Sequence, residues 1–349
     1  MNLLITSYLN TKRYSLAISL VGGIFLVFMS FSQFLARPAK AINISPPRLE
    51  LSGDPGSTIN SEFKVLNDSS STATYYTQVE NFEAGDESGS PQFVQSKEGL
   101  AVWTDVAKSI NVKAGEQVTI PFTITIPRNA EPGGYFASIF IRTTPPATEQ
   151  GEVSIGARLG SLVLLRVNGD IQEGVDILEF STKGKQHFYT SLPVELYYRF
   201  QNTGNDRVKP EGDIVIKNII GLKAKILNAN RTDGSVLPRS IRRFEMAWVN
   251  GGGGQEGVEA EAQARNSGGF FEEAKYQWSH FAFGYYTANL DITFGANNNT
   301  ADGKFRFFVF PWQLLIIIFV VIIVAFMVIR FIFRRYNRYI ISKHTPPTL

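Results

Sequence analysis

The sequence of 349 residues contains no cysteine. This absence excludes a disulfide framework, a thiolate zinc site and a cysteine nucleophile. Each folded domain of the chain must therefore be held together by its apolar core. An extracytoplasmic protein without disulfides fits a bacterial envelope better than a eukaryotic secretory route, in which disulfides are common.

Histidine is scarce, and no catalytic motif is present. His187, His280 and His344 are the three histidines, and no two of them lie at a metal-ligand spacing. The sequence has no G-x-S-x-G elbow, P-loop or dinucleotide fingerprint. The four glycines at 251–254 lack the strand, the Lys-Ser/Thr pair and the helix that surround a phosphate loop. We therefore predict no enzymatic activity, no cofactor and no metal, and we name no catalytic residue.

A basic surface is also missing from the body of the chain. Four basic residues and no acidic ones lie within residues 1–41, and five basic and no acidic ones within 330–349. With those nine set aside, the 34 basic residues of the chain leave 25 against 31 acidic ones. Because nucleic-acid binding requires a basic face that neutralises phosphates, we predict no nucleic-acid partner.

One long apolar run lies near the C-terminus. Residues 307–329 carry no charge, and Gln313 is the only conventionally polar residue among them. As a helix, the run would be about 35 Å long, enough to cross a hydrocarbon layer of about 30 Å. Trp312 lies at its start, where an indole favours the headgroup region. We predict a transmembrane helix over residues 306–333 in contact with the lipid bilayer. The competing interpretation is a buried helix of a large soluble core.

The residues after this run are basic and give the predicted orientation. Arg330, Arg334, Arg335, Arg338 and Lys343 all follow it. Since positively charged flanks stay in the cytoplasm, residues 334–349 form a predicted cytoplasmic tail. The chain is thus predicted to cross the cell membrane once, with its bulk outside the cytoplasm.

The N-terminal 41 residues have the pattern of a signal peptide. Lys12 and Arg13 precede an apolar run over residues 14–35, and Ala39 and Ala41 supply the small residues that signal peptidase reads. We predict cleavage after Ala41. The alternative is an uncleaved anchor, because the run is longer than usual, and both readings leave the middle of the chain outside.

Residues 42–170 alternate in the manner of strands. A first strand is expected over residues 44–51, a hairpin-type loop at 113–116, and a half-buried strand over 118–126, where five apolar residues recur at every second position. No sustained helical period is present. Many short strands separated by turns predict an all-β, immunoglobulin-like sandwich.

Residues 171–305 repeat this plan. Strands end at an Asn turn in both halves, at Asn67 and at Asn202, and a Gly-Tyr-aromatic strand follows each, at 134–141 and at 284–292. We predict two related sandwiches in tandem. A glycine-rich insertion at 250–269 is expected to form a long loop. Residues 297–303 are expected to be the last loop or the stalk onto the membrane.

Three groups of residues could form a binding site for a metal, an anion or a carbohydrate. Glu80, Glu83, Asp86 and Glu87 are the nearest approach to a calcium site, but their spacing matches no known signature and favours a solvated loop. Arg239, Arg242 and Arg243 form a small basic group that either touches anionic wall polymer or lipid, or is a solvated strand end. Trp103 and Trp248 have apolar neighbours and are expected in cores rather than in carbohydrate platforms.

Short motifs along the chain give a resemblance. They are Ile44-Ser45-Pro46-Pro47, Val65-Leu66-Asn67-Asp68, Ala130-Glu131-Pro132-Gly133-Gly134-Tyr135, Arg158-Leu159-Gly160, Gln201-Asn202-Thr203-Gly204-Asn205 and Val236-Leu237-Pro238. With the overall layout, they resemble the bacterial WxL-interacting protein family. The resemblance implies a first domain that binds peptidoglycan and a second that binds host or surface proteins, beside partners that bear W-x-L motifs. It implies no individual ligand-binding residue.

Together these observations predict a membrane-anchored surface protein that engages peptidoglycan or another envelope protein through its sandwiches. The alternative is a structural or assembly subunit of a membrane or secretion complex, for which Gln313 and the basic tail would matter.

Overall fold

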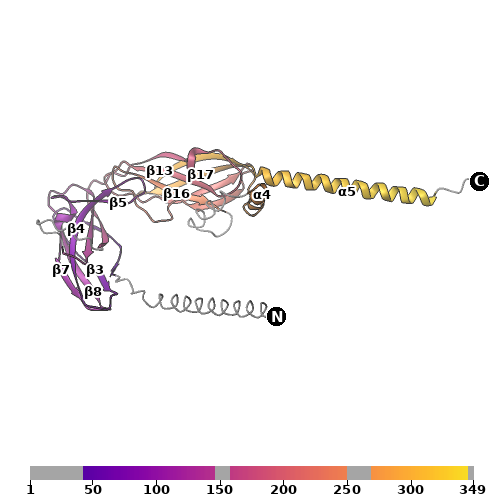
Figure 1. The fold of residues 1–349 in the computed structure, drawn as a ribbon. Helices are drawn as coiled ribbons and strands as arrows, with labels where there is room; N and C mark the ends of the chain where they lie inside the picture. The colour runs from indigo at the N-terminus through magenta and orange to yellow at the C-terminus, as the bar shows by residue number, and fades with distance from the viewer. Residues whose placement is uncertain (1–41, 146–157, 250–268, 345–349) are drawn as a thin grey trace, which may run out of the picture.

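The computed structural model describes residues 42–145, 158–249 and 269–344, with only the helical backbone given for 339–344. The predicted signal peptide and all of the predicted insertion except Gly269 lie outside these residues. Figure 1 shows two strand-built domains followed by one long helix, α5, that leaves the far end of the second domain. The predicted all-β class with a single C-terminal apolar helix is confirmed.

The first domain consists of two facing sheets. One contains, in order, β1 (Ile42–Ser45), β3 (Thr58–Asn67), β8 (Gln117–Thr125) and β6 (Thr104–Val106). The other contains β2 (Arg48–Gly53), β10 (Arg158–Val167), β9 (Gly133–Arg142), β4 (Ala73–Ala84) and β5 (Pro91–Val94), and β7 (Ser109–Val112) pairs with β4. A single helical turn, α2 (Leu100–Trp103), precedes β6.

The core between these sheets follows the predicted alternation. Ile120, Phe122, Ile124 and Ile126 are each 2% exposed or less, whereas the residues between them are more open to solvent. They pack against Ile139, Ile141 and Leu165 of the opposite sheet in one apolar cluster. Period-two burial of this kind is what fixes the register of a half-buried strand.

Two predicted elements of the first domain were wrong. The single strand expected over 44–51 is divided: β1 pairs with β3, and β2 pairs in parallel with β10 in the other sheet. Pro46 and Pro47 have no N–H to donate to a ladder, so the chain changes sheets there. The turn at 113–116 is not a hairpin, because β7 pairs with β4 whereas β8 pairs with β3.

The second domain repeats the order of the first. One sheet contains β11 (Val175–Thr182), β13 (Val194–Asn202) and β16 (Ile241–Trp248), and a short 3-10 turn, η2 (Lys183–Lys185), follows β11. The other contains β12 (Phe188–Tyr189), β18 (Asn299–Val309), β17 (Gly284–Phe294), β14 (Glu211–Asn218) and β15 (Lys223–Asn228). The divided first strand recurs as well: β12 runs parallel to β18, as β2 does to β10.

A buried asparagine occupies the same place in each domain. Asn67 ends β3 and Asn202 ends β13, and both are fully buried. Each donates its side-chain amide to the carbonyl four residues later, Ser71 at 2.9 Å and Asp206 at 2.7 Å. Each also accepts the N–H two residues later. The two turns that suggested a repeat are thus built in the same way.

The C-terminal apolar helix begins later than predicted. The charge-free run from residue 307 includes the end of β18, in which Phe307 and Val309 are at most 2% exposed and belong to the core of the second sandwich. Pro311 then ends the strand, and α5 (Trp312–His344) follows. The helix also continues past residue 333 into the predicted tail. It is long and apolar enough to cross a membrane, and none of its most apolar stretch is buried.

Two further expectations about the second domain need correction. Only Asn297 and Asn298 of residues 297–303 lie in the last turn, and the rest form neither a loop nor a stalk, because β18 begins at Asn299 and pairs with β17 along its whole length. A helix that the sequence reading missed, α4 (Phe270–Ser279), lies at the base of α5. There the backbone N–H of Leu314 donates to Gln277 Oε1 at 3.0 Å.

Candidate functional site at the domain junction

Two of the motifs that carried the family resemblance, at 130–135 and 201–205, meet where the two domains join. Gly134 donates its N–H to the carbonyl of Asn205 at 2.9 Å, and the Asn205 side chain donates to the carbonyl of Pro132 at 3.1 Å. Gly133 has a φ of +144°, and a Cβ on it would lie 2.6 Å from the Asn205 oxygen. Because only glycine permits this approach, the Pro-Gly-Gly and Asn-Thr-Gly-Asn motifs act here as a structural joint.

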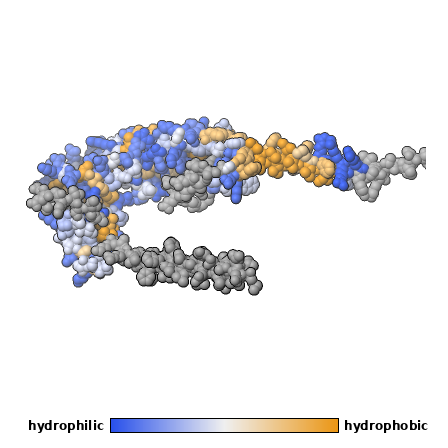
Figure 2. Space-filling view, viewed as in Figure 1, coloured by the Kyte–Doolittle hydropathy of each residue, from blue (hydrophilic) through white to orange (hydrophobic). Residues whose placement is uncertain are grey.

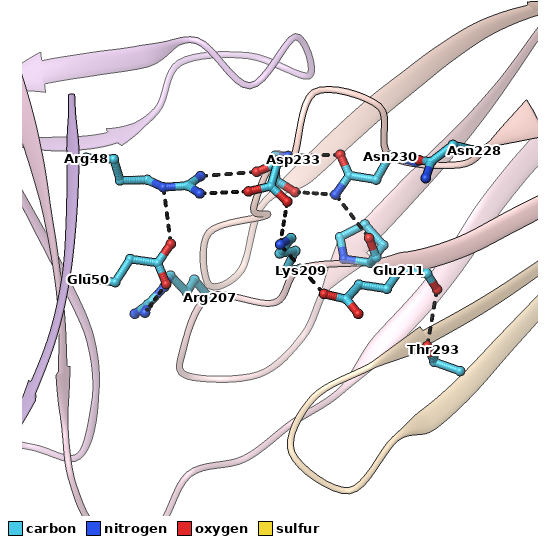
Figure 3. Close-up of polar contacts among 11 residues, drawn as sticks. Arg48, Glu50, Arg207, Lys209, Glu211, Asn228, Asn230, Asp233 and Thr293 are labelled. Carbon is cyan, nitrogen blue, oxygen red and sulfur yellow. Dashed lines mark hydrogen bonds and ion pairs between the residues drawn. The ribbon is translucent and has the colours of Figure 1, made fainter. Parts of the chain in front are cut away.

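Ion pairs flank this joint on one side (Figure 3). Arg48 at the start of β2 lies 2.9 Å from the carboxylate of Asp233, which is in a turn of the second domain. Lys209 contacts the same carboxylate from within the second domain. Glu50 bridges Arg48 at 3.1 Å and Arg207 at 3.0 Å, which adds a second bond between the domains.

The other side of the joint uses the predicted acidic cluster. Glu87 accepts a hydrogen bond from Arg199 Nε at 2.8 Å, and its carbonyl accepts the N–H of Arg243 at 2.7 Å. Glu80 lies on β4, is 8% exposed and pairs with Arg158 at 3.1 Å, and Asp86 accepts a hydrogen bond from the Ser88 N–H. The solvated-loop interpretation was therefore wrong for Glu80 and Glu87. No group of three or more potential metal ligands occurs among the described residues.

Acid is expected to loosen the joint. The hydrogen bond from Arg199 lowers the pKa of Glu87, and Lys209 followed by Arg48 lowers the pKa of Asp233. A carboxylate with a lowered folded-state pKa stabilises the joined state above its unfolded pKa, and this contribution is lost as the pH falls through the folded value. With dyes at Ser70→Cys and Lys304→Cys, the distribution of energy-transfer distances should be narrow at pH 7 and should broaden as the pH falls below the ordinary carboxylate range of about 4.

Arg199→Gln should broaden the same distance already at pH 7. The matched control is Lys183→Gln, which removes an ion pair to Glu195 within the second domain and should leave the distance narrow. A distribution that stayed narrow until the domains themselves unfolded in acid, or equal behaviour of the two variants, would show that the carboxylates do not hold the joint.

The basic group predicted at 239–243 divides into different environments. Arg243 pairs with Glu245 at 2.7 Å and its guanidinium lies over the ring of Tyr197 at 3.9 Å. Arg242 lies between Gly89 of the first domain and Gly234 of the second, and a Cβ on either glycine would meet its guanidinium. It donates Nη1 to the carbonyl of Ser235 at 3.0 Å, and its buried Nε has no hydrogen-bond partner. Burial lowers its pKa.

Two clefts open beside Arg242 at the junction. One, of about 220 Å³, is lined by Arg48, Phe82 and Asp233 among others. The second, of about 400 Å³, is lined by Arg231, Arg243, Glu87 and Glu245 among others. Within the described part of the chain, neither Arg231 nor Arg242 has an ion-pair partner, whereas Glu87 and Glu245 are both paired. A guanidinium with free donors binds carboxylates and phosphates in preference to other groups, so the second cleft suits an anion.

The remaining candidates are structural. His187 Nδ1 lies 2.8 Å from the carbonyl of Arg306, and its ring stacks on Phe305 at 4.7 Å. His280 stacks on Tyr276 at the end of α4. Trp248 is 3% exposed in the core, as predicted. Trp103 is only partly buried and lies against Tyr135 at 4.5 Å.

No protein-family model matches the chain, and no curated protein matches it. Among solved structures, the class 5 fimbriae chaperone CfaA is matched over 78% of this chain and 100% of its own, at 11% identity and a TM-score of 0.37. The CsuC–CsuE chaperone–adhesin complex of Acinetobacter baumannii is matched over 76% and 97%, at 11% and 0.35. The E. coli chaperone DraB is matched over 76% and 97%, at 10% and 0.34. These similarities are too distant to bear on function.

Proposed function

We propose that this chain is a single-pass membrane protein of the cell envelope whose two sandwiches lie outside the cytoplasm and bind a carboxylate-bearing partner at the domain junction. The peptide stems of a wall glycan and the chains of other surface proteins both carry such carboxylates. The observation that carries the proposal is at the joint: Arg231 and Arg242 line one cleft, and neither has an ion-pair partner among the described residues. The single apolar helix supports the anchoring.

The resemblance to the WxL-interacting family is part of this proposal. It implies peptidoglycan binding by the first domain and binding of a surface protein by the second. The junction is consistent with either, since residues of both domains line its clefts. We expect no enzymatic activity.

The alternative function is an assembly subunit, for which Gln313, as a polar contact for another membrane helix, and the basic tail would matter. In the structure, Gln277 Nε2 donates to Gln313 Oε1 within the same chain. The side chain of Gln277 is fully buried. The amide that favoured this alternative is therefore already bonded.

Removal of the two arginines should weaken ligand binding. In a pull-down of full-length protein with purified peptidoglycan, Arg231→Gln/Arg242→Gln should bind at least about tenfold more weakly, because hydrogen bonds to charged groups contribute roughly 1.5–3 kcal/mol. Lys304→Gln, an exposed change away from the junction, is the matched control and should bind normally. Cross-linking of the same variants in native membranes tests whether the partner is another surface protein.

Equal binding by the double variant and the control would exclude the cleft as the site. If the unchanged protein bound no peptidoglycan and cross-linked to no envelope protein, the binding function itself would be wrong.

A further inference from the structure

Exposed apolar side chains of the second domain gather at the end from which α5 leaves. Of the fourteen large hydrophobic residues exposed among the described residues before α5, ten lie at this end and four elsewhere. The space-filling view shows hydrophobic residues at the base of α5 that continue into the helix (Figure 2). Soluble surfaces rarely concentrate apolar residues in this way without a partner.

The turn between β14 and β15 supplies one part of this surface. Ile219, Ile220 and Leu222 are 77%, 74% and 61% exposed. Asn218 pairs with Tyr286, and Tyr286 pairs with Phe307, five residues before α5 begins. The strand register therefore places this turn at the same end of the sheet as the last residues of β18, from which it is separated by β17.

The chain around α4 supplies the second part. Phe271 and Trp278 are 76% and 70% exposed, and because they are seven residues apart they share one face of the helix. Phe270 contacts Trp312 at a ring distance of 5.9 Å. Gln277, on a different face, is bonded to the first turn of α5, so α4 is fixed to the base of the membrane helix.

The segment before β17 completes the surface. Phe281 and Phe283 are each 50% exposed and Tyr285 is 60% exposed. Tyr285 contacts Phe308 at 4.4 Å, and Phe283 contacts Phe310 at 6.0 Å. These rings thus join the last residues before α5. We call the three parts together, with Phe188, the collar.

The length of α5 determines where the collar lies. With Phe307 and Val309 in the sandwich, the uncharged part of the helix is residues 312–329, about 27 Å long at 1.5 Å per residue, against about 30 Å of hydrocarbon. With its charge-free part in the hydrocarbon, the helix brings the end of the second domain to the headgroup layer. Aromatic side chains favour this layer.

We propose that the collar is a second membrane-binding surface, seated in the headgroup layer of the outer leaflet, which fixes the second sandwich directly on the bilayer. The occupant is lipid, since the surface is continuous with the helix that crosses the membrane. This inference rests on the proposed anchoring by α5. The collar adds a second contact between the domain and the membrane, besides α5, and this contact restricts the orientation of the domain.

The test uses the absence of cysteine. Single cysteines replace Ile220, Phe271, Val320 in α5, or Val102, an exposed residue of the first domain that serves as control. Each full-length protein carries an environment-sensitive dye and is placed in phosphatidylcholine–phosphatidylglycerol vesicles with lipids bearing a quencher near the headgroup or deep in the chain. We expect headgroup-level quenching at 220 and 271, deep quenching at 320 and none at 102.

Each other outcome has a distinct meaning. Quenching at 320 with water-like signals at 220 and 271 would overturn the collar and leave the anchor intact. No quenching at 320 would overturn the anchoring and, with it, the collar. If Ile220→Cys cross-linked between two copies and showed no quenching by lipid, a second copy would cover the collar. The proposal that lipid covers it would then be wrong.

Discussion

Replacement of Val321 and Ala325 by arginine should remove the protein from the membrane. Both residues lie near the middle of α5, and Val321 is 59% exposed on its surface. Each arginine costs roughly 2.5–3.5 kcal/mol at the centre of a membrane helix, so the pair should abolish stable insertion. Alkaline carbonate extraction of membranes should release the variant, whereas the unchanged protein should stay in the pellet.

The matched control for this result is Val321→Leu/Ala325→Leu, which changes the same positions without adding charge. It should remain in the pellet. A double-arginine variant that also resisted extraction would show that α5 is not the anchor.

Loss of the Asn67 side chain should strongly destabilise the first sandwich. Its amide donates to the carbonyls of Ser71 and Val112 at 2.9 and 3.0 Å, and its oxygen accepts from the Tyr75 hydroxyl at 2.8 Å. Asn67→Ala leaves these buried groups unpaired, at a cost of about 1–3 kcal/mol for each group that water does not reach. We expect the free energy of unfolding of the first domain to fall by roughly 3 kcal/mol.

Urea unfolding of the full-length protein in detergent can assign this effect to one domain. In single-tryptophan variants, with the other three tryptophans replaced by phenylalanine, Trp103 reports the first sandwich and Trp248 the second. The Trp103 transition should move to lower urea while the Trp248 transition stays in place. Asn202→Ala, at the equivalent turn, should do the reverse, and exposed Asn43→Ala should change neither. Unchanged transitions in both buried variants would contradict this role.

Patterns confined to one strand or turn were sufficient to predict much of the fold. The alternation that ends at Ile126 shows which face of the strand is buried. The turns at Asn67 and Asn202 depend on hydrogen bonds between neighbouring residues. Both patterns can be recognised directly in the sequence. The buried position of Trp248 followed from its neighbours in the same way.

Elements defined by distant partners could not be predicted. Phe307 and Val309 are as uncharged as the helix after them, and only the pairing of β18 with β17 assigns them to the sandwich. Helix α4 is stabilised by Gln277 contacting α5, thirty-seven residues away. Arg48 and Asp233 are separated by 185 residues, and a single charge in a turn gives no sign of its partner.

The cleft lined by Arg231 and Arg242 could be predicted only in part from the sequence. Arg242 belonged to a recognisable basic group, but nothing local showed that Gly89 of the first domain and Gly234 of the second would enclose it. A useful signal was the presence of glycine-containing motifs, because two of them, at 130–135 and 201–205, meet at the joint. Short motifs of this kind reflect close approach of backbones as readily as they reflect ligand contacts.

The account depends most on the two sandwiches lying on one side of the membrane and the basic tail on the other. The direct measurement is labelling of Ser70→Cys or Ser342→Cys with a membrane-impermeant maleimide in intact cells and after permeabilisation. We predict that Ser70→Cys, exposed on the first sandwich, is labelled in both, and that Ser342→Cys is labelled only after permeabilisation. Labelling of Ser342→Cys in intact cells with protection of Ser70→Cys would contradict the account.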